Sequence, residues 1–151
     1  QDTGYAHRFR KFIWLKNTLK FLKSLDHNKL LFFIVTNQSG IGRKIYSEKI
    51  FINLHKKIKN FLVKKNIFID EVKYCPHHPE FGVGKYKKKC KCRKPNNKMI
   101  KDLQKNWSIK IKDSIMIGDS KSDYITARKS NIKFYYINDK NLLRIKKNIL
   151  N

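Results

Sequence analysis

The 151-residue sequence predicts one α/β domain: a three-layer, Rossmann-like fold with a mostly parallel sheet, helices on both faces and a metal-binding loop. Three observations favour this class. Segments with helical spacing of apolar residues alternate with short apolar runs of strand length. Polar loops follow three elements, as expected where ligands lie beyond the carboxyl ends of parallel strands. The hydrophobic fraction of 40% is typical of a globular protein.

The first half of the chain predicts two helices and two strands. Apolar residues recur on one helical face over residues 12–26. The run LLFFIVT, residues 30–36, predicts a buried strand that ends in a polar loop. Ser47 is a suitable N-cap for a helix over residues 47–65. Residues 67–74 alternate well enough for a second strand.

The second half predicts three more helices and two more strands after a cysteine-rich loop. Pro95 marks the entrance to the next helix, because proline is favoured in the first helical turn. The strand after that helix stops at Gly-Asp. The predicted elements are a helix over 97–106, a strand over 114–117, a helix over 122–130, a strand over 133–137 and a basic helix over 141–150.

The charge of the chain is strongly positive, with 36 Lys and Arg against 11 Asp and Glu and a formal net charge of +25. Such a surface attracts phosphates, so nucleic acid, anionic lipid and small phosphorylated substrates are candidate partners. Lysines spread along the whole chain are also typical of a general bias in residue usage. No apolar run reaches the roughly 18 residues of a membrane span, and no signal peptide is visible. We expect a cytoplasmic, monomeric protein without membrane contact.

All three cysteines lie in one loop, CPHHPEFGVGKYKKKCKCRKP, residues 75–95. Cys75, His77, Cys90 and Cys92 follow the pattern C-x-H-x12-C-x-C. Three thiolates and one imidazole suit tetrahedral Zn²⁺, and a full set of four leaves no position for water, so the zinc would be structural. The adjacent His78 leaves the identity of the fourth ligand open, and small buried cysteines are the alternative reading.

A polar loop, TNQSG, follows the predicted strand over residues 30–36. The hydroxyl of Thr36, followed by Asn37, Gln38 and Ser39 with backbone amides, predicts a phosphate cradle. An ordinary polar turn is the alternative. The sequence alone leaves both open.

Two aspartates follow the strand over residues 114–117. Asp119 and Asp123 suit Mg²⁺, which prefers oxygen ligands, although Asp119 could instead be a helix N-cap. Arg93 and Lys94 come directly after the last cysteine and offer fork-like and point-like contacts to phosphate. For Arg93 and Lys94 the alternative is general surface charge.

Taken together, TNQSGI, CPHHP, CKCRKP and IGDSKSD, in this order, resemble the haloacid dehalogenase-like phosphatases. Within them the chain is most similar to the D-glycero-D-manno-heptose 1,7-bisphosphate 7-phosphatase branch, with the histidinol-phosphatase branch next. The long gap between His77 and Cys90 favours the heptose branch. The resemblance extends from Gly4-Tyr5 to about Ile137. It implies a Mg²⁺-dependent phosphoric monoester hydrolase with a structural zinc, which acts through an aspartyl-phosphate on a small phosphorylated sugar for lipopolysaccharide core biosynthesis.

The resemblance also implies a role for each candidate residue. Thr36 and Lys94 would bind the reacting phosphoryl group. Asp119 would bind Mg²⁺, with Asp123 in support. Ser120 stands where the heptose branch often has a lysine. The residues that would contact the substrate are Asp2, Thr3, Gly4, Tyr5, Asn37, Gln38, Ser39, Arg93 and Ser120.

The D-x-D-G-T motif, which carries the nucleophile and the acid in these enzymes, does not occur in the 151 residues. The strand that bears it normally lies in mid-sheet, so we expect its neighbours to be left unpaired. Because the first residue is Gln1 rather than Met, we expect residues 1–151 to be an N-terminally truncated phosphatase domain without turnover as given. A degenerate protein that never had the motif is the alternative.

Two other hypotheses remain open from the sequence. Polynucleotide 3′-phosphatases share a stretch similar to TNQSGIGR, residues 36–43, and the net charge suits nucleic acid, but they do not resemble the cysteine-rich loop. A non-catalytic, zinc-stabilised module that binds anions or nucleic acid is the alternative from outside enzymology.

Overall fold

The structure, a computed structural model, describes residues 8–137, 142, 145 and 146. It is an α/β protein, as predicted. Most of the predicted C-terminal helix over residues 141–150 lies outside the described residues. The elements in chain order are η1 (Phe9–Lys11), α1 (Thr18–Lys23), β1 (Phe33–Asn37), α2 (Ser39–Gly42), α3 (Glu48–Val63), β2 (Glu71–Cys75), η2 (Gly84–Tyr86), α4 (Lys98–Asn106), η3 (Ile111–Asp113), β3 (Ile115–Gly118), α5 (Lys121–Lys129) and β4 (Lys133–Tyr136).

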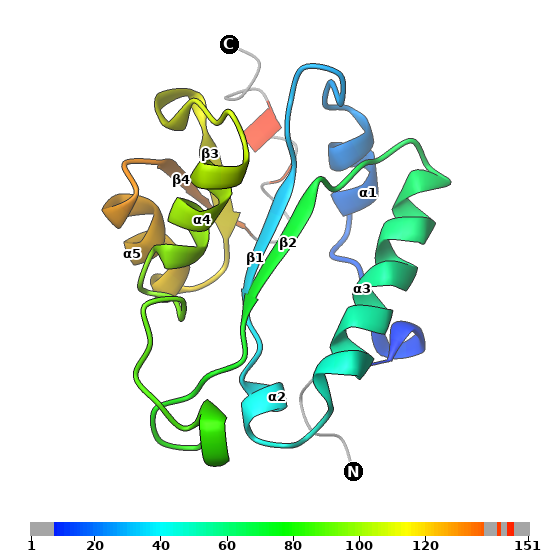
Figure 1. Ribbon diagram of the computed structural model, residues 1–151. Coiled ribbons are helices and arrows are strands. Elements are labelled where there is room, and N and C mark those ends of the chain that lie inside the picture. The colour runs from blue at the N-terminus through cyan, green and yellow to red at the C-terminus, as the bar shows by residue number, and fades with distance from the viewer. Residues whose placement is uncertain (1–7, 138–141, 143–144, 147–151) are drawn as a thin grey trace.

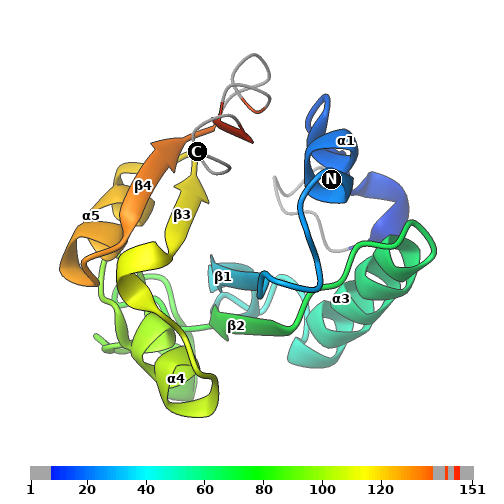
Figure 2. The same cartoon turned by 90° about the horizontal axis from the view of Figure 1, so that it is seen from above.

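The strands form two separate parallel pairs rather than one continuous sheet. β1 pairs with β2, and β3 pairs with β4. Within the described part of the chain, β1 and β3 do not pair with each other. Figure 2 shows the two pairs apart, with β1 and β3 as the strands of each pair that face the other. Two separate parallel pairs are what the sequence predicted for a parallel sheet whose middle strand is absent from the residues described.

Helices cover both faces of the β1–β2 pair because its side chains alternate between the two faces. Ile34 of β1 and Val72 of β2 pack against the core that Leu54, Ile58 and Leu62 of α3 form. On the other face, the rings of Phe33 and Trp107, which follows α4, make an edge contact with centroids 5.5 Å apart. α5 packs against β3 and β4 (Figure 1). The three-layer arrangement is thus present around β1 and β2.

The long helix α3 matches its prediction because local signals agree there. The Ser47 side chain accepts a hydrogen bond from the Ile50 N–H, as the N-cap prediction required. Its apolar stripe is buried, with Ile58 and Leu62 only 2% and 1% exposed. Among the described residues, no helix is both long and apolar enough to cross a membrane.

The first helix is shorter than predicted. α1 begins at Thr18, directly after Asn17, whose φ of 67° is left-handed and interrupts a helix. Upstream, Trp14 stacks on Phe61 of α3 with centroids 5.7 Å apart, and Phe12 makes an edge contact with Trp14. Aromatic residues have low helix propensity, so tertiary packing against α3 determines this segment instead.

The first strand also begins later than predicted. Leu30 and Leu31 are 38% and 45% exposed, and β1 starts only at Phe33. The Phe32 N–H donates to Asp70 Oδ2 at 2.6 Å, and the Asp70 N–H donates to the Phe32 carbonyl. Pairing with β2 therefore starts beside Asp70, and the two leucines before it have no partner strand among the described residues.

Candidate functional site

The carboxyl ends of β1 and β2 are joined to the cysteine-rich loop by hydrogen bonds. The Gln38 N–H, just after β1, donates to the Cys75 carbonyl at 2.8 Å. The Asn37 side chain pairs with the backbone of Lys94 in both directions: it accepts from the Lys94 N–H at 2.9 Å and donates to the Lys94 carbonyl at 3.1 Å. Because parallel strands end at the same edge, the segments that follow β1 and β2 lie at that edge (Figure 1).

The structure brings the four predicted zinc ligands together. The ligand atoms of Cys75, His77, Cys90 and Cys92 all lie within 4.8 Å of one another. The three Sγ atoms are 2.9 to 3.4 Å apart, and His77 Nδ1 lies 3.3 Å from Cys92 Sγ and 3.5 Å from Cys75 Sγ. No disulfide joins these cysteines. Among the described residues, this is the one group of three or more Cys, His, Asp or Glu side chains close enough to share an ion.

The donor set fits zinc in both geometry and chemistry. Zn–S bonds of about 2.3 Å in a tetrahedron place sulfur atoms about 3.8 Å apart, slightly wider than the separations here. Burial raises the pKa of Cys75 and of Cys92, so thiolates at this place need a nearby cation. Of the two adjacent histidines, His77 is the one that lies with the three cysteines. His78 Nδ1 instead accepts the N–H groups of Glu80 and Phe81.

Hydrogen bonds hold the two cations that follow the cluster. The Arg93 guanidinium donates from Nη1 to the carbonyl of His77 at 3.1 Å. The Lys94 ammonium donates to the carbonyl of Val35 at 2.9 Å and lies 2.5 Å from Asp123 Oδ1. The side chains of this ion pair are 11% and 6% exposed. Val35 lies on β1 and Asp123 on α5, so the ammonium group bridges the two strand pairs.

Asp123 is held by Ser120 as well as by Lys94. Ser120 is the N-cap of α5, and its N–H and hydroxyl both donate to Asp123 Oδ2, at 3.2 and 2.7 Å. Burial acts to raise the pKa of Asp123, but hydrogen bonds from Lys94 and Ser120 outweigh burial and lower it. Asp119 is exposed and is not the N-cap. Of the two predicted Mg²⁺ residues, only Asp119 is not already held in this network.

The hydroxyl of Thr36 is oriented by a short chain of hydrogen bonds. Gln38 Nε2 donates to Thr36 Oγ1 at 2.9 Å, and the Tyr46 hydroxyl donates to Gln38 Oε1 at 2.6 Å. Thr36 therefore accepts a hydrogen bond and retains its own proton for donation. Tyr46 was missed by the sequence analysis, and only its position in the motif-rich segment after β1 could have pointed to it.

The predicted phosphate cradle is only partly what the sequence suggested. The Gln38 N–H binds the Cys75 carbonyl, so it is not directed at a ligand. The Gln38 side chain contacts Thr36 and Tyr46, and the Asn37 side chain contacts Lys94. These two side chains position other groups in this structure. Ser39 begins the short helix α2 where a loop was expected. The predicted contacts Asp2, Thr3, Gly4 and Tyr5 lie outside the described residues.

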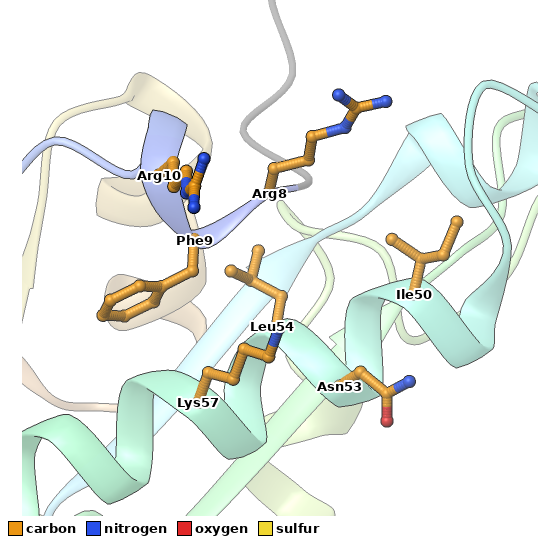
Figure 3. Close-up of a pocket in the computed structure, with 7 residues that line it drawn as sticks. All are labelled: Arg8, Phe9, Arg10, Ile50, Asn53, Leu54 and Lys57. Atoms are coloured by element: carbon orange, nitrogen blue, oxygen red, sulfur yellow. The ribbon is translucent and has the colours of Figure 1, made fainter.

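A cavity of about 340 Å³ lies elsewhere, between η1 and α3. Figure 3 shows Phe9 and Leu54 lying near each other in it, with the side chains of Arg8 and Lys57 on either side of them. None of the predicted site residues lines this cavity. The candidate site is thus the open edge of the strands and not this cavity.

Comparison with known proteins identifies the family of the chain. A family model described as polynucleotide kinase 3 phosphatase matches residues 3–141. The D-glycero-beta-D-manno-heptose-1,7-bisphosphate 7-phosphatase of Photorhabdus laumondii is 36% identical over 126 residues, which is 83% of this chain and 67% of the relative. The enzyme of the same name from Vibrio cholerae is 34% identical over 131 residues, covering 87% and 70%. The chain belongs to this family of haloacid dehalogenase-like phosphatases.

Two solved structures share the fold. A protein from Mesorhizobium loti, described as a HAD-like phosphatase, superposes with a TM-score of 0.84 at 21% identity, covering 99% of this chain and 79% of the other. The D,D-heptose 1,7-bisphosphate phosphatase of B. bronchiseptica, in complex with magnesium and phosphate, has a TM-score of 0.74 at 20% identity, covering 98% and 89%. With curated relatives named as phosphatases, the chain is a phosphoric monoester hydrolase by resemblance.

Proposed function

We propose that this chain belongs to an enzyme that removes the 7-phosphate of D-glycero-D-manno-heptose 1,7-bisphosphate. The observation that carries the proposal is the position of Lys94. Its ammonium group is fixed between Val35 and Asp123 at the edge where Thr36 also lies. A fixed cation and a hydroxyl donor at the carboxyl end of a parallel strand suit a transferring phosphoryl group. The curated relatives with this name support the choice of substrate.

In this proposal the described residues bind and orient the phosphate. The Thr36 hydroxyl donates to one phosphoryl oxygen, while Lys94 neutralises charge on the others. Asn37 and Gln38 position Lys94 and Thr36, and Ser39 contacts the sugar. Arg93 and Ser120 contact the substrate beyond the reacting phosphate. The segment Asp2, Thr3, Gly4 and Tyr5 would contact the sugar as well.

The proposal includes two metals. Zn²⁺ would be held by the four clustered ligands and would stabilise the loop that carries Lys94. Mg²⁺ would be bound by Asp119, with Asp123 supporting, and would supply neutralisation of phosphate charge. The magnesium and phosphate in the B. bronchiseptica complex support this choice of ion.

The residues given contain no D-x-D pair, so we propose that this chain binds the substrate without turning it over. Its enzyme would work as a cytoplasmic monomer, in the route to nucleotide-activated heptose for lipopolysaccharide core. Free thiols in the cluster are consistent with a reducing compartment.

The test is substrate binding by Thr36→Val, which removes the hydroxyl and keeps the side-chain shape. We expect isothermal titration to show that the zinc-loaded chain binds heptose 1,7-bisphosphate, and that this variant binds about tenfold more weakly, because a hydrogen bond to a charged group is lost. Thr18→Val makes the same change away from the site and should leave affinity unchanged. Equal affinity of Thr36→Val and the unaltered chain would contradict the proposal, as would tighter binding of histidinol phosphate.

A second candidate is a polynucleotide 3′-phosphatase. The family model described as polynucleotide kinase 3 phosphatase and the net charge of +25 favour it. An oligonucleotide with a 3′-phosphate should then bind more tightly than the same oligonucleotide with a 3′-hydroxyl at each salt concentration. Equal affinity for the two oligonucleotides would indicate non-specific charge attraction and would exclude this candidate.

A further inference from the structure

Tyr46 is buried beside the segment that follows β1, where it packs against a glycine. It is 6% exposed and belongs to the apolar cluster with Ile41 and Phe51. A Cβ at Gly40 would lie 2.8 Å from the Tyr46 hydroxyl oxygen, so the ring occupies space that only glycine leaves open. The Ile45 N–H donates to the Gly40 carbonyl at 2.9 Å and closes the turn that leads to Tyr46. Packing therefore sets the position of the Tyr46 hydroxyl.

The Tyr46 hydroxyl determines which way round the Gln38 amide lies. It donates to Gln38 Oε1 at 2.6 Å, so the amide oxygen faces Tyr46. The amide nitrogen faces Thr36, and Gln38 Nε2 donates to Thr36 Oγ1 at 2.9 Å. Because an amide has an acceptor end and a donor end, a partner that fixes one end also fixes the other. Thr36 thus accepts a hydrogen bond from the protein and keeps its own proton for a ligand.

The groups at this edge therefore offer hydrogen-bond donors to a ligand. The Thr36 hydroxyl has one proton to donate. The Lys94 ammonium has one of its three left, because the others face the Val35 carbonyl and Asp123. Both carboxylate oxygens of Asp123 already accept, one from Lys94 and the other from Ser120. A phosphate monoester dianion has three unprotonated oxygens that accept such bonds, whereas the monoanion carries a P–OH proton that needs an acceptor.

We propose that Tyr46, acting through Gln38, makes the site select the dianion of a phosphate monoester over its monoanion. Tyr46 is in this role a positioning residue that determines specificity. The inference rests on the proposed function, in which Thr36 and Lys94 hold the reacting phosphate. Without the Tyr46 hydroxyl, the Gln38 amide can turn its oxygen toward Thr36. Thr36 would then donate to Gln38 and accept the P–OH proton of the monoanion.

Other titratable and charged groups at this edge do not account for such selectivity. They are Tyr74, which is opposite Thr36 in the β1–β2 register, its partner Glu48, and Lys94, Asp119 and Asp123. Burial and the hydrogen bond to Glu48 raise the pKa of Tyr74 to about 12, so it stays neutral near pH 7. Burial acts to raise the pKa of Asp123, but hydrogen bonds from Lys94 and Ser120 outweigh it, so Asp123 stays ionised. Glu48, Lys94, Asp119 and Asp123 are present in every variant below, so a comparison between variants cancels their effect.

The experiment is isothermal titration of the zinc-loaded 151-residue chain with D-glycero-D-manno-heptose 7-phosphate at about pH 7.5 and about pH 5.5. The second pKa of a phosphate monoester is roughly 6, so the dianion fraction falls about fourfold between these values. We expect the affinity of the unaltered chain to fall by the same factor. Tyr46→Phe keeps the ring and should bind about threefold more weakly at the higher pH, but its affinity should fall less than about twofold at the lower pH.

The matched control is Tyr74→Phe, which also removes a partly buried tyrosine hydroxyl, with a hydrogen bond to Glu48 Oε1 of 2.7 Å. Its affinity should keep the full dependence on pH. Gln38→Leu removes the amide through which Tyr46 acts, so it should show the same weak pH dependence as Tyr46→Phe. Adding Tyr46→Phe to Gln38→Leu should then have no further effect, because two changes in one hydrogen-bonded chain are not additive.

The outcomes separate this inference from the proposed function. If the unaltered chain does not bind the 7-phosphate, the proposed function fails and the inference fails with it. If it binds and Tyr46→Phe keeps the full pH dependence, only the role of Tyr46 is refuted. An affinity of the unaltered chain that is the same at both pH values would refute the selectivity. A weak pH dependence in Tyr74→Phe, or additive losses in the double variant, would refute the path through Gln38. Circular dichroism and zinc content at both pH values establish that each variant is folded and loaded.

Discussion

The substitution Asp123→Asn tests whether the ion pair with Lys94 holds the two strand pairs together. The variant keeps the side-chain size but removes the charge that faces the Lys94 ammonium, whose other hydrogen bond is to the Val35 carbonyl. Removing one partner of a buried pair costs roughly 3 to 5 kcal/mol. Because the amide can still accept from Ser120, we expect about 3 kcal/mol, which for a chain of this size lowers Tm by roughly 6 to 12 °C.

Urea unfolding of the zinc-loaded chain, followed by circular dichroism near neutral pH, measures this loss. The matched control is Asp102→Asn, which breaks an ion pair with Lys98. This pair is more exposed, with 51% of the Lys98 side chain and 32% of the Asp102 side chain accessible to solvent. That change should cost only about 0.3 to 0.5 kcal/mol. A loss below about 0.5 kcal/mol in Asp123→Asn, equal to the control, would refute the argument that burial makes this pair strong.

Three further predictions follow from the same contacts. Since the folded state lowers the pKa of Asp123, its stabilising effect is present above the ordinary pKa near 4 and is lost as pH falls through the lower folded value. In thermal unfolding, the difference in stability between the unaltered chain and Asp123→Asn should therefore be constant above about pH 5 and shrink as pH falls below about 4, and a difference that stays constant below about pH 4 would contradict the shift. Cys90→Ser should reduce the zinc content measured in a metal assay from one ion per chain to a small fraction of that, and the loosened loop before Lys94 should then bind phosphate more weakly. Unchanged phosphate affinity after verified zinc loss would contradict the link between the metal and the site. Gly42→Ala should lower the free energy of unfolding in urea by about 1 to 3 kcal/mol, because its Cβ would meet the Pro76 carbonyl, whereas the control Gly84→Ala has open space around it and is strained only by its φ of +55°. An equal loss of stability in both variants would show that the close approach is not the cause.

Local signals account for the parts of the fold that the sequence predicted well. The apolar stripe and the Ser47 cap of α3 act within a few residues of each other, so periodicity and capping rules suffice. The Cys and His side chains that cluster could be predicted equally well, because C-x-H and C-x-C pairs at both ends of one loop are specific in type and spacing. The start of α1 could not be predicted, since packing of Trp14 on α3 overrides the helical pattern.

Contacts between distant segments account for what the sequence could not give. The bond between Lys94 and Asp123 spans 29 residues, and the paired bonds between Asn37 and Lys94 span 57. The sequence analysis predicted that Gln38 contacts the substrate, yet in this structure its side chain is hydrogen-bonded to Thr36 and Tyr46. Residue type identified the polar positions at the strand ends. Only the tertiary structure separates those that would touch a ligand from those that orient a neighbour.

The charge of the cysteine-rich loop explains why a phosphatase site would need a structural metal. Residues 77–94 carry seven Lys and Arg and a single acid, Glu80, and Gly82 is their one fully buried residue. Such a segment has neither an apolar core nor opposite charges to order it, and its cations repel one another. A metal ion that links Cys75, at the end of β2, to Cys90 and Cys92 would fix both ends of the loop. Lys94 needs a fixed backbone, because its ammonium group must reach Val35 and Asp123 at once.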